Sequence, residues 1–377
     1  MHVVVLGAGY AGVTLVRKLE RTLPKTAAIT LVDKRETHLV QHLLHRAVRT
    51  PEIADQLCVP LDDCCERATV RHATVDAVEY DAGQVTLSDG TLEFDAGAVC
   101  LGAQTAYYGL PGLAEHGTPL KRPEDAEDIR KRFLELCETG GRVVIGGAGL
   151  SGIQVAGELA ELANDERADD TVAVELIEQQ PTVAPGFPAP FQDAIAEKLT
   201  ERGISIKTDT TVKSATDGTL DVADSSSIPY DQLVWTGGIT GPGALSNVRP
   251  QVRSTLRLGQ RTFGVGDAVR VIDDNGTMAP ATAQTAVRQA AIAAENIEAL
   301  VRRDGGGFDP RLSRYVYDSL GWVATVGDGT VAQVGSNVLT GTPAKTLKAT
   351  IGIQHLAGIG AVEEAIDFAQ DTFGTES

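Results

Sequence analysis

Apolar and polar residues follow two different periodicities at the start of the chain, one typical of strands and one of helices. Residues 3–6 are all apolar, as expected for a short strand buried in a parallel sheet. Apolar residues then recur at helical intervals, at Val13, Val16 and Leu19, with charged residues between them. A second apolar run ends in Asp33. This order predicts a strand, a helix and a parallel strand, which is the beginning of an open α/β sheet.

The same order of patterns returns in the middle of the chain. Residues 143–145 predict a strand, a helix carrying Glu158 follows, and the next apolar strand ends in Glu178. Outside these two copies the periodicity predicts a β-meander, a charged helix and further strands, at residues 66–94, 121–139 and 204–234.

A glycine-rich turn joins the first strand to its helix. Gly7, Gly9 and Gly12 have the spacing G-x-G-x-x-G, which allows a tight turn, the approach of a pyrophosphate and close packing of helix on strand. The helix N-terminus then faces the phosphates, and Asp33 can hold the ribose hydroxyls. A glycine-rich loop without a ligand is the alternative. The complete order of strand, turn, helix, strand and acid favours a dinucleotide.

The second copy has the same elements. Gly147, Gly149 and Gly152 supply the spacing, and Glu178 ends the following strand. Two such turns, each with its own acid, predict two separate dinucleotides. Glu178 favours NADH because its charge would repel the 2′-phosphate of NADPH.

A third signal lies in the last part of the chain. Gly266 and Asp267 end a short apolar strand, and in a chain with two dinucleotide turns this aspartate can bond the sugar-alcohol chain of a flavin. An aspartate in a solvent-facing turn is the alternative. A long helix is then predicted over residues 279–303, with its start at Thr282.

Composition excludes some classes of partner. Basic residues number 33 and acidic residues 51, so the net charge is −18, and nucleic acid is not a predicted partner because binding it requires a basic face. The excess of acidic residues predicts either an ordinary solvated surface or a protein of a salt-rich, halophilic cytoplasm, where salt ions screen the repulsion between its negative charges. Neither a spanning helix nor a signal peptide is predicted, which favours a cytoplasmic location.

Cysteines and histidines provide two further candidates. The neighbouring Cys64 and Cys65 are either redox-active or, as we favour, thiols that pack a helix. His38, His42 and His45 would share one face of a helix, a spacing that suggests a metal. No cysteine or carboxylate joins that face, so we predict no metal there.

Together these motifs resemble those of the type II NADH dehydrogenases, the single-subunit NADH:quinone oxidoreductases of the two-dinucleotide-binding flavoproteins. The resemblance runs from residue 2 to about 335. It includes the His38-Leu39-Val40-Gln41 segment, crossovers at Gly102-Ala103 and Gly237-Gly238, and a helix start at Ala283-Gln284. It implies two Rossmann-like domains, an NADH domain inserted into a discontinuous FAD domain, plus a small C-terminal region.

The resemblance also implies roles for individual residues. FAD would be held by Gly7, Gly9, Gly12, Asp33, Gly102, Asp267 and Ala283, and NADH by Gly147, Gly149, Gly152 and Glu178. Hydride passes between stacked rings, so positioning matters more than acid–base groups. The helix N-terminus at Ala283 would stabilise the negative charge of a reduced flavin, and Gln284 would neighbour the quinone.

Two positions depart from the family's pattern. The quinone-side motif A-Q-x-A-x-Q ends here in Arg288, and the helix after the second glycine turn has Gln154 where a glutamate is usual. A neutral amide cannot carry a proton, so protonation of the quinone must use another group or water. We take Gln284, Gln154 and Arg288 as candidate catalytic residues.

Related functions are distinguished by their cysteines. A disulfide reductase needs a cysteine pair beside the flavin or a C-x-x-C in the NADH domain, and sulfide:quinone oxidoreductases use cysteines in the second half. This chain has no cysteine pair in the helix expected after Asp33 and no C-x-x-C, and it has no cysteine after Cys137. A soluble NADH-dependent reductase with a protein or other small-molecule acceptor, and a redox sensor that binds NADH and FAD, are the alternatives.

The predicted division is an FAD-binding domain at residues 1–109 and 258–307, an NADH-binding domain at 110–257, and a C-terminal region at 308–377. The last region predicts a strand pair and a helix. The apolar residues of that helix are Leu347, Ile351, Ile353, Leu356 and Ile359. They are flanked by Lys345 and Lys348. Such a helix fits either peripheral contact with the inner face of the cell membrane or a homodimer interface.

Overall fold

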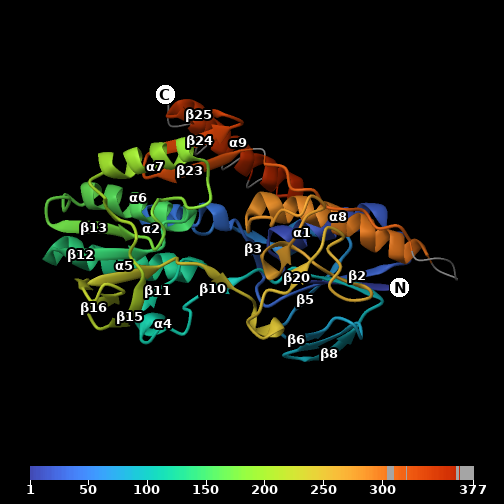
Figure 1. Cartoon of the computed structure of the whole chain (residues 1–377). Helices are drawn as coiled ribbons and strands as arrows, with labels where there is room; N and C mark the ends of the chain where they lie inside the picture. Colours follow the sequence, from blue (N-terminus) through green and yellow to red (C-terminus); the bar gives the residue numbers. More distant parts are fainter. Residues whose placement is uncertain (304–309, 320, 362–364, 366–377) are drawn as a thin grey trace.

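Two parallel β-sheets, each flanked by helices, lie side by side in the computed structural model, and the C-terminal elements lie across both (Figure 1). The structure describes residues 1–303, 310–319, 321–361 and 365. The predicted α/β class with two Rossmann-like sheets is confirmed.

The first sheet has five parallel strands in the order β21-β9-β1-β2-β5. These are β1 (His2–Leu6), β2 (Ala28–Asp33), β5 (Thr69–His72), β9 (Ala96–Val99) and β21 (Thr262–Gly264). Helices α1 (Tyr10–Thr22) and α8 (Ala283–Arg302) pack against each other on this sheet (Figure 1). Because β21 and α8 come from late in the chain, the last third of the sequence completes a unit begun by the first residues.

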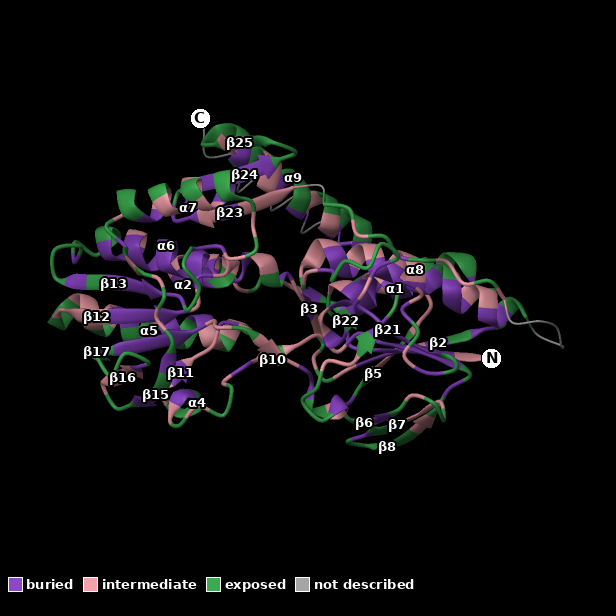
Figure 2. Ribbon diagram, in the orientation of Figure 1, coloured by how far each residue is buried: buried purple, intermediate pink, exposed green. Residues whose placement is uncertain are grey.

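The second sheet is also parallel, in the order β11-β18-β12-β13-β14. Its strands are β11 (Gly117–Thr118), β12 (Gly141–Gly146), β13 (Val172–Ile177), β14 (Ser205–Lys207) and β18 (Gln232–Trp235). Helices α5 (Pro123–Thr139), α6 (Leu150–Asp165) and α7 (Ala189–Glu201) pack against it. The central strands of both sheets are buried, whereas the outer helix faces are exposed (Figure 2). Burial on both faces explains why these strands are continuous apolar runs.

Two antiparallel three-stranded sheets project from the parallel ones. They consist of β6 (Val75–Glu79), β7 (Gln84–Leu87) and β8 (Gly90–Glu93), and of β15 (Val212–Thr216), β16 (Thr219–Val222) and β17 (Ser227–Pro229). The predicted meander over residues 66–94 is therefore partly wrong. Its first strand, β5, pairs with β2 in the parallel sheet, and only the other three strands form the meander.

The two predicted crossovers meet in space. Strand β10 (Gln104–Thr105), just after Gly102, pairs antiparallel with β19 (Ile239–Thr240), just after Gly238. The chain therefore leaves the first unit and returns to it through one two-stranded connection (Figure 1).

The C-terminal region contains one more strand than predicted. Strands β23 (Trp322–Val326), β24 (Gly329–Val334) and β25 (Asn337–Thr340) form an antiparallel sheet, followed by α9 (Thr342–Ile359). The sheet packs on α6, and α9 packs on the sheet and on α1. Leu356 and Ile359 are buried there, whereas Ile351 is 46% exposed. The helix thus uses part of its apolar surface within its own chain.

Shorter elements complete the fold: β3 (Thr37–Leu39), η1 (Gln41–Leu43), α2 (Arg46–Arg49), η2 (Pro51–Ile53), β4 (Cys58–Pro60), α3 (Leu61–Cys64), α4 (Leu113–His116), η3 (Gly243–Leu245), β20 (Gln251–Val252), η4 (Gly266–Ala268) and β22 (Arg270–Val271). None of the helices in the described part of the chain combines the length and apolar character needed to cross a bilayer.

Candidate functional site

The first glycine-rich turn connects β1 to α1 and has the geometry that its sequence predicts. Gly7 has φ +100°, and a Cβ there would lie 2.5 Å from the carbonyl oxygen of Cys100. A Cβ on Gly12 would lie 1.8 Å from the carbonyl oxygen of Gly7, so these two glycines are required for the turn and its packing. A Cβ on Gly9 would have no neighbour within 4 Å. Gly9, the middle glycine of the three, therefore faces open space at the helix N-terminus.

The second turn, between β12 and α6, repeats this geometry. Gly147 has φ +95°, and a Cβ there would lie 2.7 Å from the Cα of Gly237. A Cβ on Gly152 would lie 1.9 Å from the carbonyl oxygen of Gly147, whereas a Cβ on Gly149 would meet nothing within 4 Å. Each turn therefore leaves space beside the N-terminal amides of a long helix, which is where a pyrophosphate fits.

Each predicted acid is bonded to its own turn. The Asp33 carboxylate accepts hydrogen bonds from the backbone N–H of Ala8 (2.7 Å) and of Arg35 (2.9 Å). The Glu178 carboxylate accepts equivalent bonds from Ala148 (2.8 Å) and Gln180 (2.9 Å). The acids are thus held at the carboxyl ends of β2 and β13, with oxygen lone pairs left for a ribose.

The segment around Asp267 brings a carboxylate close to two cations. Asp267 lies on η4, and its backbone oxygen accepts a 2.6 Å hydrogen bond from Nε of Arg249. Burial raises the pKa of the Asp267 carboxyl, and the positive charges of Lys121 and Arg249 partly oppose that rise. The preceding Gly266 donates its N–H to Oε1 of the buried Gln289 on α8 (2.8 Å). Helix α8 therefore fixes the position of this turn.

Thr282 caps the N-terminus of helix α8, which begins at Ala283. The Oγ1 of Thr282 accepts a 3.2 Å hydrogen bond from the N–H of Thr285, which leaves Ala283 and the half-buried Gln284 in the first turn. Gly102, with φ +67°, follows the end of β9. Arg288, one turn further along α8, bonds the backbone oxygen of Asp318 and lies 3.6 Å from its carboxylate.

Gln154 belongs to a different hydrogen-bond network from Gln284 and Arg288. It is buried on α6, and its Oε1 accepts a 2.8 Å hydrogen bond from Nζ of Lys348 on α9. Lys348 also donates to Oγ1 of Thr325 (2.8 Å). The expectation that Lys348 flanks an exposed apolar surface is therefore wrong, because its amino group points into the protein.

The three histidines do not share one helical face. His38 lies on β3, His42 on η1 and His45 just before α2, because the chain bends twice within this segment. His38 Nδ1 lies 2.9 Å from the carbonyl oxygen of Ala8, and the His42 ring bonds the hydroxyl of Tyr10. The segment thus packs directly on the first glycine turn.

These imidazoles are held neutral by their surroundings. Burial lowers the pKa of His38 to about 4 and that of His42 to about 3. His355 of α9 joins them, with its Nε2 3.1 Å from Nε2 of His38. The described residues contain no group of three or more histidine, cysteine and acidic side chains arranged to hold a metal.

Burial raises the thiol pKa of four cysteines, which makes them poor nucleophiles: Cys58, Cys65, Cys100 and Cys137. Burial raises the pKa of Cys65 to about 12 and raises that of Cys100 still further. Within the described residues no disulfide bond is formed. Since reactivity requires the thiolate, these thiols fit packing better than redox chemistry.

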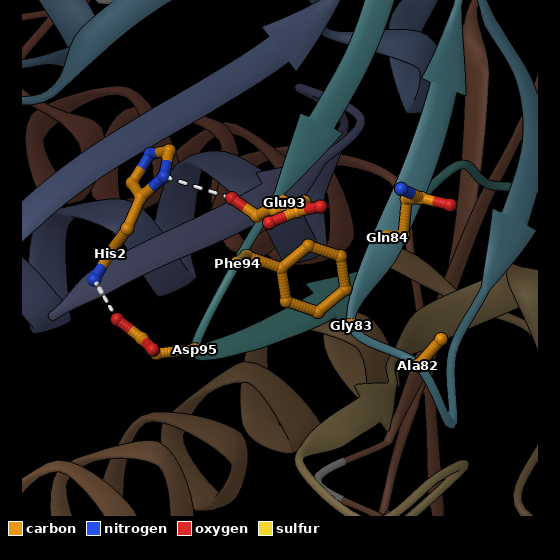
Figure 3. A pocket seen from close by; sticks show the side chains of 7 residues that line it. All are labelled: His2, Ala82, Gly83, Gln84, Glu93, Phe94 and Asp95. Carbon is orange, nitrogen blue, oxygen red and sulfur yellow. Dashed lines mark hydrogen bonds between the residues drawn. The ribbon is translucent and has the colours of Figure 1, made fainter.

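A surface hollow at the opposite end of the first sheet is not part of this site. It has a volume of about 360 Å³ and is lined by residues of β1, β7, β8 and their loops (Figure 3). His2, at the start of β1, bonds Asp95 there through its backbone N–H (2.7 Å). Dinucleotides bind at the carboxyl ends of parallel strands, whereas this hollow lies at the amino end.

Three residues near the site were not predicted from the sequence. They are Lys121, Lys348 and His355. A lysine directly beside Leu347 and Ala349 in an apolar helix is the one local sign that Lys348 points inward. Nothing local marks the other two, because their partners are far away in the sequence.

Known proteins show the same organisation. A family model described as pyridine nucleotide-disulphide oxidoreductase matches residues 1–290. A type II NADH:quinone oxidoreductase of Staphylococcus epidermidis is 27% identical over 95% of this chain and 96% of its own length. A demethylphylloquinone reductase of Synechocystis is 28% identical over 78% of each chain.

Solved structures support the fold. NDH2 from Plasmodium falciparum, determined in complex with NADH, has a TM-score of 0.80 at 16% identity and covers 99% of this chain and 98% of its own. A sulfide:quinone oxidoreductase from Aquifex aeolicus has a TM-score of 0.80 at 19% identity, covering 99% and 95%. The resemblance to type II NADH dehydrogenases predicted from the motifs is confirmed, and the chain belongs to the pyridine nucleotide-disulphide oxidoreductase family.

Proposed function

We propose that this protein is a flavoenzyme that takes hydride from NADH and passes the electrons to a quinone. The observation that carries the proposal is the duplicated turn. Each copy combines two glycines that the backbone requires, one glycine facing open space, and an acid tied to the turn. Relatives aligned over nearly the whole chain are named NADH:quinone oxidoreductases.

The two coenzymes would occupy the two turns. FAD would lie at Gly7, Gly9 and Gly12, with Asp33 at its ribose and Asp267 at its ribityl chain. NADH would lie at the second turn, where Glu178 would accept from the ribose hydroxyls and exclude a 2′-phosphate. When bound, FAD supplies the ability to accept a hydride and release electrons singly or in pairs.

The chain's own residues would orient this chemistry. The amide groups at the start of α8, at Ala283 and Gln284, would donate to negative charge that develops on a reduced ring. Gln284 would contact the acceptor. Arg288 is engaged with Asp318, so it would line the acceptor's path rather than react.

Several finer points belong to the same proposal. The FAD-binding part would comprise residues 1–109 and 258–307, the NADH-binding part 110–257, and the C-terminal region 308–377. The exposed Ile351 of α9 is a candidate contact for a membrane surface or a second copy of the chain. The net charge of −18 fits a salt-rich cytoplasm.

Steady-state kinetics of the FAD-loaded protein test the proposed acceptor. NADH oxidation should be rapid with a quinone and slower with ferricyanide or a dye. Activity with the dye alone would support a reductase for another acceptor. Tight NADH binding with almost no turnover would support a redox sensor.

A further inference from the structure

A pair of imidazoles connects the C-terminal helix α9 to the first glycine turn. Nε2 of His355 on α9 lies 3.1 Å from Nε2 of His38 on β3. Nδ1 of His38 in turn lies 2.9 Å from the carbonyl oxygen of Ala8, which stands between Gly7 and Gly9 of the turn. His38 is fully buried. Helix α9 therefore reaches the turn proposed for FAD through the side chain of His38.

The direction of these hydrogen bonds follows from the acceptor at one end. Burial lowers the pKa of His38 to about 4 and that of His355 to about 3, so both rings are neutral near pH 7. A carbonyl oxygen can only accept, so Nδ1 of His38 donates to Ala8. In a neutral imidazole the other nitrogen is then the acceptor, and Nε2–H of His355 is the donor between the rings. The donors thus run from α9 through His38 to the backbone of the turn.

His355 also contacts the residue on the other side of the open glycine. Tyr10, the first residue of α1, directly follows Gly9. Its ring centroid lies 4.5 Å from that of His355, and its hydroxyl bonds the ring of His42. Both neighbours of Gly9, which are Ala8 and Tyr10, are therefore held by side chains of one histidine cluster.

The second glycine turn is completed in a different way. In both turns the alanine between the first two glycines donates its N–H to the acid of that turn. The carbonyl oxygen of Ala148 then accepts a 2.8 Å hydrogen bond from the backbone N–H of Ala184. The equivalent oxygen of Ala8 is bonded by His38 instead. The second turn thus uses a backbone amide, whereas the first depends on a side chain whose other nitrogen contacts α9.

We propose that His355 is a positioning residue for FAD, which holds His38 against Ala8 and thereby keeps the first turn in the shape that binds the pyrophosphate. The inference rests on the proposed function. Phosphates are bound by backbone N–H groups, so the carbonyl groups of the turn must point elsewhere. A turn that is fixed before binding loses less conformational entropy when FAD binds. Without His355, Nε2 of the buried His38 would be an acceptor without a donor, and its ring would no longer be fixed on Ala8.

Three substitutions in α9 test this role in the FAD-loaded full chain. His355→Leu removes the donor. His355→Gln retains one, because the amide of glutamine can place an N–H near the position of the imidazole Nε2. Gln354→Leu is the matched control, since Gln354 is the exposed neighbour of His355 on the same helix. FAD release after dilution is followed by the fluorescence of free flavin, and the second turn is probed by titration with NAD⁺, which has no hydride to transfer.

The expected results distinguish positioning from packing. Since the loss of one neutral hydrogen bond changes an equilibrium roughly three- to tenfold, His355→Leu should release FAD roughly three to ten times faster than the parent. His355→Gln and Gln354→Leu should release it at about the parental rate, and NAD⁺ affinity should be unchanged in all three. Parental release in His355→Leu would overturn the inference. Equally fast release in His355→Gln, or a matching loss of NAD⁺ affinity, would also overturn it, because the residue would then only fill space.

Hydrogen exchange provides a readout in the unmutated chain. If α9 supports the binding of FAD, then FAD must support α9 by the same factor, because coupling between two sites is reciprocal. The amides of α9, residues 342–359, should exchange roughly three to ten times more slowly in the FAD-loaded than in the FAD-free chain. Those of α7, residues 189–201, should be unchanged. Equal exchange of α9 in both states would contradict the inference.

These measurements separate the inference from the proposed function. Neither FAD release nor hydrogen exchange requires NADH or a quinone. If both behave as expected but NADH does not reduce the bound flavin, the proposed function fails and the role of His355 stands. If quinone is reduced but His355→Leu keeps FAD as the parent does, the inference fails and the proposed function stands.

Discussion

The middle glycine of each turn should separate ligand binding from folding. Gly149 has φ −72° and ψ 178°, a conformation that alanine adopts without strain, and a Cβ there would meet no protein atom within 4 Å. Gly149→Ala should therefore fold as stably as the parent, or more stably by about 0.4–1 kcal/mol because the unfolded chain loses freedom. The added methyl group occupies the space proposed for the pyrophosphate of NADH.

The cost to binding follows from the hydrogen bonds that the methyl group displaces. A hydrogen bond to a charged group contributes about 1.5–3 kcal/mol, so the loss of one should weaken NADH binding roughly ten- to hundredfold. Gly152→Ala should instead lower the stability of the fold. Its Cβ would lie 1.9 Å from the carbonyl oxygen of Gly147, and relieving that overlap should destabilise the fold by about 1–3 kcal/mol.

Thermal unfolding and an anaerobic NADH titration of the FAD-loaded variants measure both effects. Gly9→Ala is the matched control at the first turn, where φ is −74° and a Cβ likewise meets nothing within 4 Å. It should bind FAD roughly ten- to hundredfold more weakly and keep its fold. Parental NADH affinity in Gly149→Ala would refute the assignment of the open space to a phosphate. A Gly149→Ala variant less stable than Gly152→Ala would refute the packing argument.

Three further predictions concern stability and surfaces. Gln289→Leu should lower the free energy of unfolding by about 1–3 kcal/mol in a urea titration, because the buried N–H of Gly266 loses its acceptor; an unchanged midpoint would contradict this. Ile351→Glu should leave the melting temperature unchanged and weaken sedimentation with anionic vesicles, and undiminished vesicle binding would rule out this face of α9. Dialysis from molar to about 0.1 M salt should lower the melting temperature, because the Debye length grows from about 3 Å to about 10 Å; a constant value would exclude adaptation to high salt.

The parallel units could be predicted because their signals are local. Gly7, Gly12, Gly147 and Gly152 are fixed by contacts within a few residues or with the adjacent strand, and strands buried on both faces are apolar throughout. The assignment of β5 to the meander was wrong because its place in a sheet depends on a strand far away in the sequence. Four residues of alternating polarity look alike in an edge strand of a parallel sheet and in a meander, and only the partner strand distinguishes them.

The hydrogen-bond network around Lys348 could not be predicted because its members are distant in sequence. Lys348 meets Gln154 across 194 residues, and His45 meets Thr325 across 280. The helical spacing of the histidines was misleading, since β3 and η1 replace the expected helix. Lys348 shows the same difficulty, because a lysine beside apolar residues fits both an interfacial helix and a helix whose lysine is hydrogen-bonded inside the protein.

The central claim is that two coenzymes lie end to end with their reactive rings between the two parallel sheets. An anaerobic titration of the purified, FAD-loaded protein with NADH, followed by a quinone, tests it most directly. We predict a yellow protein whose flavin absorbance is lost on addition of an equimolar amount of NADH and returns when the quinone is added. A protein that stays colourless after incubation with FAD, or whose flavin keeps its absorbance in excess NADH, would contradict the claim.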